Sequence, residues 1–127
     1  MRVLTQPLKE LAEFDTMLGS LQKAAREGKG VCLSLSGCTD SQKLHMMHGL
    51  GEGFRNKLLV TYSDKRVREI AEEFSFYERN VMTFPARDLI FYQADIHGNE
   101  LVTQRMKVLR RLLDGSPVTV VTTFDAL

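Results

Sequence analysis

A glycine, a polar turn and a lysine follow one another in the stretch "SGCTDSQK", which covers residues 36 to 43. Their order is that of a phosphate-binding loop, G-x-x-x-x-G-K-[ST], in which backbone N–H groups surround the phosphates and the lysine contacts them. Gly37 fills the first glycine position and Lys43 fills the lysine position. The chemistry to consider first is therefore nucleotide binding.

Three replacements in this loop oppose that chemistry. Gln42 stands where the second glycine would let the backbone approach a phosphate. Leu44 replaces the hydroxyl that would bind Mg²⁺, and Asp40 adds a negative charge where phosphates would lie. We therefore expect a degenerate loop without catalysis, although weak anion binding at the helix N-terminus and productive ATP hydrolysis both remain open. The candidate residues of this degenerate phosphate loop are Gly37, Thr39, Asp40, Ser41, Gln42 and Lys43.

Short apolar strands alternate with amphipathic helices around this loop. The predicted strands are Val31 to Leu35, Leu58 to Tyr62, Val81 to Phe84 and Val118 to Thr122. Four helices are predicted. The first begins at Pro7 and ends at Gly28, and the second is capped by Asp40 or Ser41 and runs towards Gly51. The third covers about 64 to 77 and is capped by Ser63 or Asp64, and the fourth covers about 100 to 114 and is capped by Asn99. This alternation predicts an α/β fold, a three-layer sandwich whose mainly parallel sheet has about four strands, similar to a degenerate P-loop NTPase.

Composition limits the classes of protein to consider. The chain has 127 residues, 43% of them apolar and 26% charged, which is ordinary for one soluble domain. A formal net charge of +1 gives no bulk attraction for nucleic acid. No apolar run is long enough to span a membrane and no signal peptide is visible, so we expect a cytoplasmic protein. Because the sequence stops directly after a strand, we expect one α/β subdomain, 1 to 127, of a parent protein that continues beyond it.

Metal chemistry and disulfide chemistry find little support. The two cysteines, Cys32 and Cys38, are too few for a disulfide framework, and we expect Cys32 to be a small core residue. His45 and His48 have a spacing that can bind metal on a helix, but no third ligand lies close in sequence. We therefore expect no metal site.

Arg105 is the charged residue that the pattern explains least. It falls among the apolar residues of the last predicted helix, where an unpaired charge would cost several kcal/mol. Asp88, Asp95 and Asp125 are possible partners, which would give Arg105 a structural role, while contact with another protein or with phosphate is the alternative. On the same helix we expect Lys107, Arg110 and Arg111 to form a solvated basic stripe that could touch nucleic acid weakly.

Four stretches together resemble one protein family. They are "SGCTDSQK", "KLLVTYSD", "VMTFPARDLIFYQADIHGNELVTQRMKVLRRLLDG" and "VTVVTTFDAL". In this order they resemble the N-terminal region of the bacterial transcription-repair coupling factor, Mfd. The related excision-repair helicase UvrB has the same order but an intact phosphate loop, and the segment between "FPARDLIFY" and "HGNE" is too short for its DNA-clamping hairpin. The departures at Gln42 and Leu44 therefore favour the coupling factor.

The resemblance implies a role in DNA repair. Members of the family displace stalled RNA polymerase by ATP-driven translocation on DNA and recruit UvrA, with ATP and Mg²⁺ bound by a motor far downstream. This piece would be the first subdomain of their UvrB-like module, a non-catalytic scaffold without a cofactor of its own. Its partners would be other domains of the parent, and UvrA, RNA polymerase and DNA through the parent. The alternatives are an ATP-binding UvrB-type fragment or small P-loop NTPase, and a module that binds damaged DNA directly.

Overall fold

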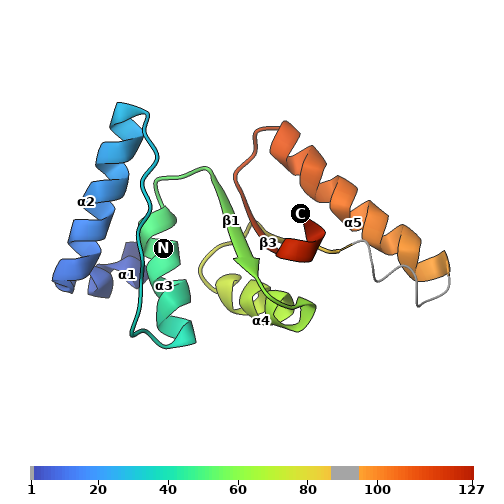
Figure 1. The fold of residues 1–127 in the computed structure, drawn as a ribbon, viewed down its shortest axis with the longest axis horizontal. Helices are drawn as coiled ribbons and strands as arrows, with labels where there is room; N and C mark the ends of the chain where they lie inside the picture. Colours follow the sequence, from blue (N-terminus) through green and yellow to red (C-terminus); the bar gives the residue numbers. More distant parts are fainter. Residues whose placement is uncertain (1, 87–94) are drawn as a thin grey trace. The chain divides into compact units, whose positions relative to one another are not determined.

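A computed structural model describes residues 2–86 and 95–127 of the chain. Helices and strands alternate along most of this part (Figure 1). In chain order the elements are α1 (Arg2–Thr5), the 3₁₀ helix η1 (Gln6–Glu10), α2 (Ala12–Glu27), α3 (Asp40–Gly51), β1 (Asn56–Thr61), α4 (Asp64–Phe74), β2 (Val81–Phe84), α5 (Asp95–Leu113), β3 (Val118–Thr123) and the 3₁₀ helix η3 (Phe124–Ala126).

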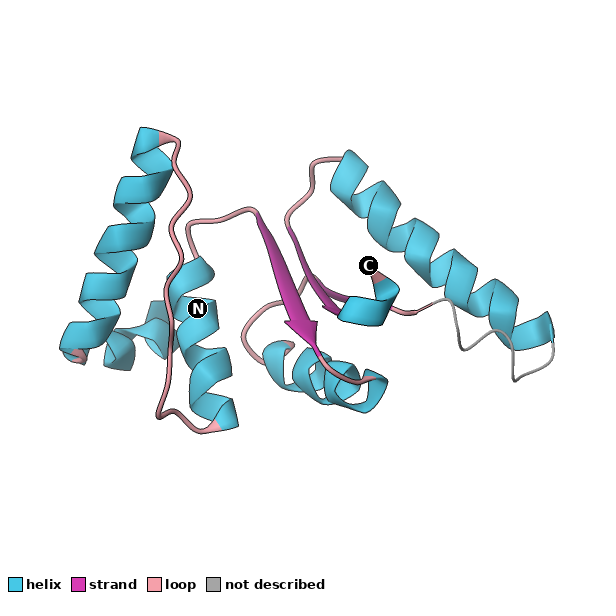
Figure 2. Ribbon diagram, in the orientation of Figure 1, coloured by secondary structure: helices cyan, strands magenta, loops and turns pink. Residues whose placement is uncertain are grey.

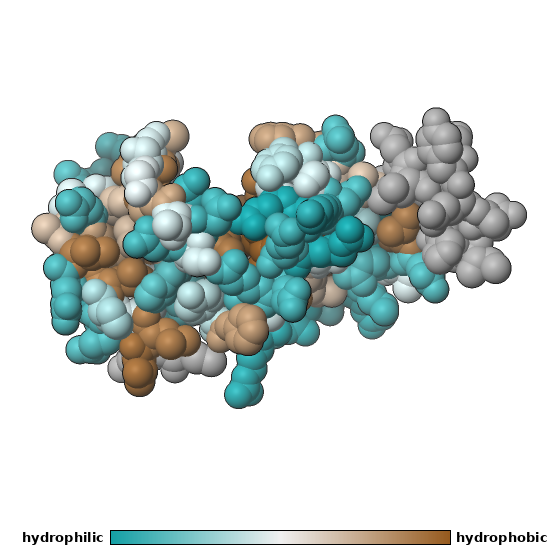
Figure 3. All heavy atoms as spheres, turned by 90° about the horizontal axis from the view of Figure 1, so that it is seen from below, coloured by the Kyte–Doolittle hydropathy of each residue, from teal (hydrophilic) through white to brown (hydrophobic). Residues whose placement is uncertain are grey.

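The chain divides into two compact units, each with its own interior. Unit 1 covers residues 1–53 and contains the helices up to α3, and unit 2 covers residues 54–127 and contains the sheet. None of the helices in the described residues is both long and apolar enough to cross a bilayer. Hydrophobic atoms, brown in Figure 3, also reach the surface among hydrophilic ones.

Unit 2 is built on a parallel sheet of three strands in the order β1-β3-β2. The register sets Leu58 beside Val120 and Met82 beside the same residue, so these three side chains share one face of the sheet. Helix α5 packs on β2 and β3 at this face, with Val108 in a cluster with Val118 and Val120. Helix α4 also packs on β2 and β3. All six residues of β3 are buried, as expected for a central strand covered on both faces.

Helix α4 follows directly from its sequence. The side chain of Ser63 accepts a hydrogen bond from the backbone N–H of Arg66, which satisfies one of the donors that a helix leaves free at its start. Three apolar residues at helical spacing, Val67, Ile70 and Phe74, are buried. The prediction that Ser63 or Asp64 caps this helix is confirmed for Ser63, although the helix ends at Phe74 rather than near residue 77.

Unit 1 has a small apolar core of its own. Leu8 of η1, Phe14 of α2 and Met46 of α3 are buried together. Gly49 permits the close approach, because a Cβ at that position would lie 2.6 Å from Leu8 Cδ1 and 2.9 Å from Phe14 Cε2. The short N-terminal helices are therefore held against α3 by packing as well as by hydrogen bonds.

The predicted strand Val31 to Leu35 is wrong. The whole connection between α2 and α3 has no regular secondary structure (Figure 2), and Val31 to Ser34 are exposed. Cys32, predicted to be a core residue, is exposed as well. An apolar run becomes a strand only when a neighbouring strand supplies its hydrogen bonds, and within unit 1 the described residues contain no strand. The sheet of the described residues therefore has three strands where about four were expected.

Three predicted helix starts also differ from the structure. Pro7 lies within η1, and α2 starts later, at Ala12. The cap of α3 is Thr39 rather than Asp40 or Ser41. Helix α5 begins at Asp95, so Asn99 lies inside it and is not its cap. Near the starts of α3 and α5 the sequence offers several residues of the capping type, and local preference alone does not select among them, whereas α2 starts after Leu11 without a side-chain cap.

Candidate functional site

The candidate phosphate loop lies in unit 1, between the irregular connection and α3. Gly37 has a φ of +77°, a left-handed conformation that favours glycine and turns the chain towards the helix. Thr39 then adopts an extended conformation and caps α3. The sequence order of glycine, turn and helix is therefore present, but the strand that should precede the glycine is not.

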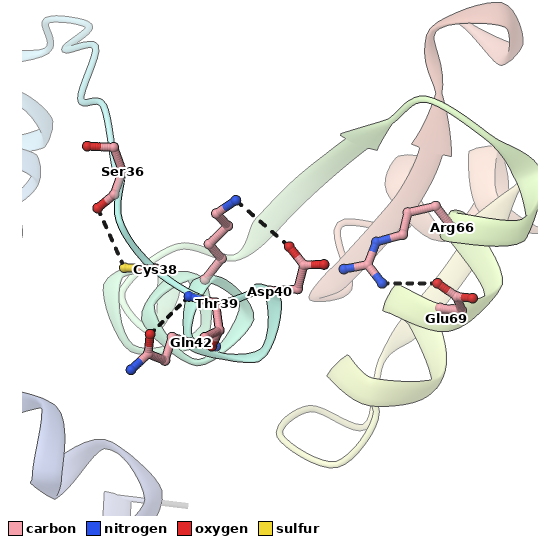
Figure 4. Close-up of polar contacts among 8 residues, drawn as sticks. Ser36, Cys38, Thr39, Asp40, Gln42, Arg66 and Glu69 are labelled. Atoms are coloured by element: carbon pink, nitrogen blue, oxygen red, sulfur yellow. Dashed lines mark hydrogen bonds and ion pairs between the residues drawn. The ribbon is translucent and has the colours of Figure 1, made fainter.

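Gln42 forms a capping box with Thr39 (Figure 4). Its Oε1 atom accepts a hydrogen bond of 3.0 Å from the backbone N–H of Thr39. In return, Thr39 Oγ1 accepts one of 3.3 Å from the backbone N–H of Gln42. Two backbone donors at the helix start are thereby satisfied by side chains. In a working phosphate loop such donors would point at the ligand.

The remaining loop residues include an ion pair at the surface. Lys43 Nζ lies 3.8 Å from Asp40 Oδ1, and both side chains are substantially exposed, at 43% and 70%. Ser41 is exposed on the first turn of α3, and Leu44 is buried. The lysine charge is thus shared with a carboxylate, and the position of the Mg²⁺-binding hydroxyl is an apolar side chain in the interior.

A pocket of about 510 Å³ lies beside this loop, within unit 1. Its apolar part includes Leu8, Leu35 and Met46, and its polar part includes Gln42 and His45. His45 Nε2 is 2.6 Å from the carbonyl oxygen of Leu4, so this ring is fixed by the N-terminal helix. Ser36, Gly37 and Cys38 of the loop also line the pocket, so it combines apolar side chains with polar groups.

Arg105 lies in unit 2, at the carboxyl ends of two neighbouring strands. Its Nη1 atom donates to the carbonyl oxygens of Pro85, at 2.7 Å, and Ala126, at 3.0 Å. Its guanidinium carbon is 4.0 Å from the centroid of the Phe84 ring. Arg105 therefore links the segments that follow β2 and β3. Of the predicted acidic partners, Asp88 and the side chain of Asp95 lie outside the described residues.

The predicted basic stripe of α5 is only partly solvated. Lys107 and Arg110 are exposed, whereas Arg111 is half-buried and its Nη2 donates to Asn80 Oδ1 at 3.3 Å. Arg111 thus connects α5 to the chain just before β2. Lys107 and Arg110 are thus the solvated members of the predicted stripe.

An ion pair that was not predicted from the sequence lies at the amino ends of the strands. Lys57 Nζ lies 2.5 Å from Glu78 Oε1, and Thr119 Oγ1 donates to Glu78 Oε2 at 2.5 Å. The side chains of Lys57 and Glu78 are only 18% and 14% exposed. Glu78 lies in the connection between α4 and β2, so these contacts tie that connection to β1 and β3. No local spacing signals this pairing, because its members are far apart in the chain.

Among the residues that the structure describes, no group of three or more His, Cys, Asp and Glu side chains could hold a metal ion. His48 is buried, and its Nε2 lies 3.8 Å from Oε1 of Glu52, the residue that follows α3. His45, as described above, contacts a backbone carbonyl. The two histidines therefore have separate neighbours.

Comparisons with models of protein families, with curated proteins and with solved structures found no match to this chain.

Proposed function

We propose that this chain is the first subdomain of a UvrB-like module of a bacterial transcription-repair coupling factor, and that it acts as a scaffold without catalysis. The observation that carries the non-catalytic part is the capping box, in which Gln42 takes the place of a phosphate-loop glycine and engages Thr39. The family assignment is supported by the four sequence stretches given above and by the α/β architecture of unit 2.

A scaffold must keep its own structure without a bound ligand, and unit 2 has contacts that would do this. The sheet of unit 2 has a polar contact at each end of its strands. The Lys57–Glu78 ion pair lies at the amino end, and the hydrogen bonds of Arg105 lie at the carboxyl end. Such a body can hold neighbouring domains of the parent without any ligand. The protein would work in the cytoplasm and reach UvrA, RNA polymerase and DNA through the parent, whose motor would supply ATP hydrolysis.

Titration with Mg-ATP tests the non-catalytic part against the alternative of a live P-loop NTPase. We expect no binding tighter than about 100 µM, because the loss of two or three charge-assisted contacts of about 1.5–3 kcal/mol each removes most of a micromolar affinity. The Lys43→Ala variant is the matched control, and it should bind no more weakly than the unchanged chain. Saturable binding in the micromolar range that Lys43→Ala abolishes would refute the proposal in favour of the NTPase.

Reading the gene downstream of residue 127 tests the family part separately. The proposal requires a helicase motor several hundred residues later, and a short open reading frame without one would contradict it. Direct binding of damaged DNA, the remaining alternative, would show as a gel shift with a steep dependence on salt concentration.

A further inference from the structure

We draw no further inference here: the strongest candidate, the apolar groove of about 310 Å³ in unit 2 that Leu58, Leu109 and Val120 line between α5 and the sheet, carries none because nothing in the described residues shows what covers it.

Discussion

At the scale of single residues, the strongest polar feature is the contact of Glu78 with Lys57 and Thr119. It ties β1 and β3 to the connection that precedes β2 through two short contacts, and its charged members are nearly buried. A charge in such a place is tolerated because its partners are already in position. The pair formed by Arg66 and Glu69, 3.0 Å apart, offers a comparison on the same unit, because its carboxylate is 47% exposed (Figure 4).

We expect Glu78→Gln to lower the free energy of unfolding by about 2 kcal/mol, because Lys57 keeps its charge but loses its carboxylate partner. Denaturation with urea measures the change. Glu69→Gln is the control and should cost less than about 0.5 kcal/mol, since a pair whose carboxylate is in contact with solvent contributes little. Equal effects of the two substitutions would show that the Glu78 contact is no stronger than a surface pair.

At the scale of elements, helices and strands were predicted best from the sequence where one local pattern pointed to a single structure. Ser63 before a clear apolar periodicity predicted α4, and the β-branched run from Val118 predicted β3. The capping box of Thr39 and Gln42 fits the pattern of a threonine followed three residues later by glutamine, so the sequence did hold the signal that was missed.

The strand predicted over Val31 to Leu35 failed for a different reason. Its residues have the β-propensity of a strand, yet propensity reports only how well a side chain fits a sheet that already exists. The Lys57 and Glu78 contact was equally beyond local reasoning, because only the register of the finished sheet brings these residues together.

Amide hydrogen exchange checks the assignment of residues 31–35. We expect their amides to exchange at rates close to those of an unstructured chain, because the segment has no strand partner and is largely exposed. The amides of β3 serve as the internal reference and should exchange slowest. Protection of 31–35 that matches β3 would mean that this segment is a fourth strand after all.

Arg105 links two elements, and its removal should loosen both. We expect Arg105→Lys to cost about 1–3 kcal/mol of stability, because an ammonium group lacks the planar fork and the stacking surface that guanidinium offers to Phe84. Arg110→Lys is the matched control on the exposed side of the same helix. Urea denaturation of both variants gives the comparison, and equal stabilities would assign Arg105 no structural role.

At the scale of the whole molecule, each unit has an interior that can be perturbed by itself. In unit 1 the sensitive position is Gly49, where a Cβ would come within 3 Å of Leu8 and Phe14 side-chain atoms. Unit 2 has its separate cluster around Val108. When a residue in one core is substituted, hydrogen exchange in the other core should therefore serve as the internal reference.

We expect Gly49→Ala to destabilise unit 1 by about 1–3 kcal/mol through overpacking. Hydrogen exchange should show faster exchange in α2 and α3 and little change in β3. Gly53→Ala is the control, because a Cβ there meets no atom within 4 Å. Unchanged exchange in α3 with Gly49→Ala would mean that the side chains of Leu8 and Phe14 move aside for the added methyl group at little cost.

The order of the strands also bears on how the protein can acquire its shape during synthesis. In the described residues β1 and β2 are both bonded to β3, which is the last of the three to be made. Until residues 118–123 have left the ribosome, neither earlier strand has a neighbour to pair with. A nascent chain must therefore keep β1 unpaired while about fifty-six residues are translated and β2 unpaired while about thirty-three are translated, and the sheet then closes in one late step.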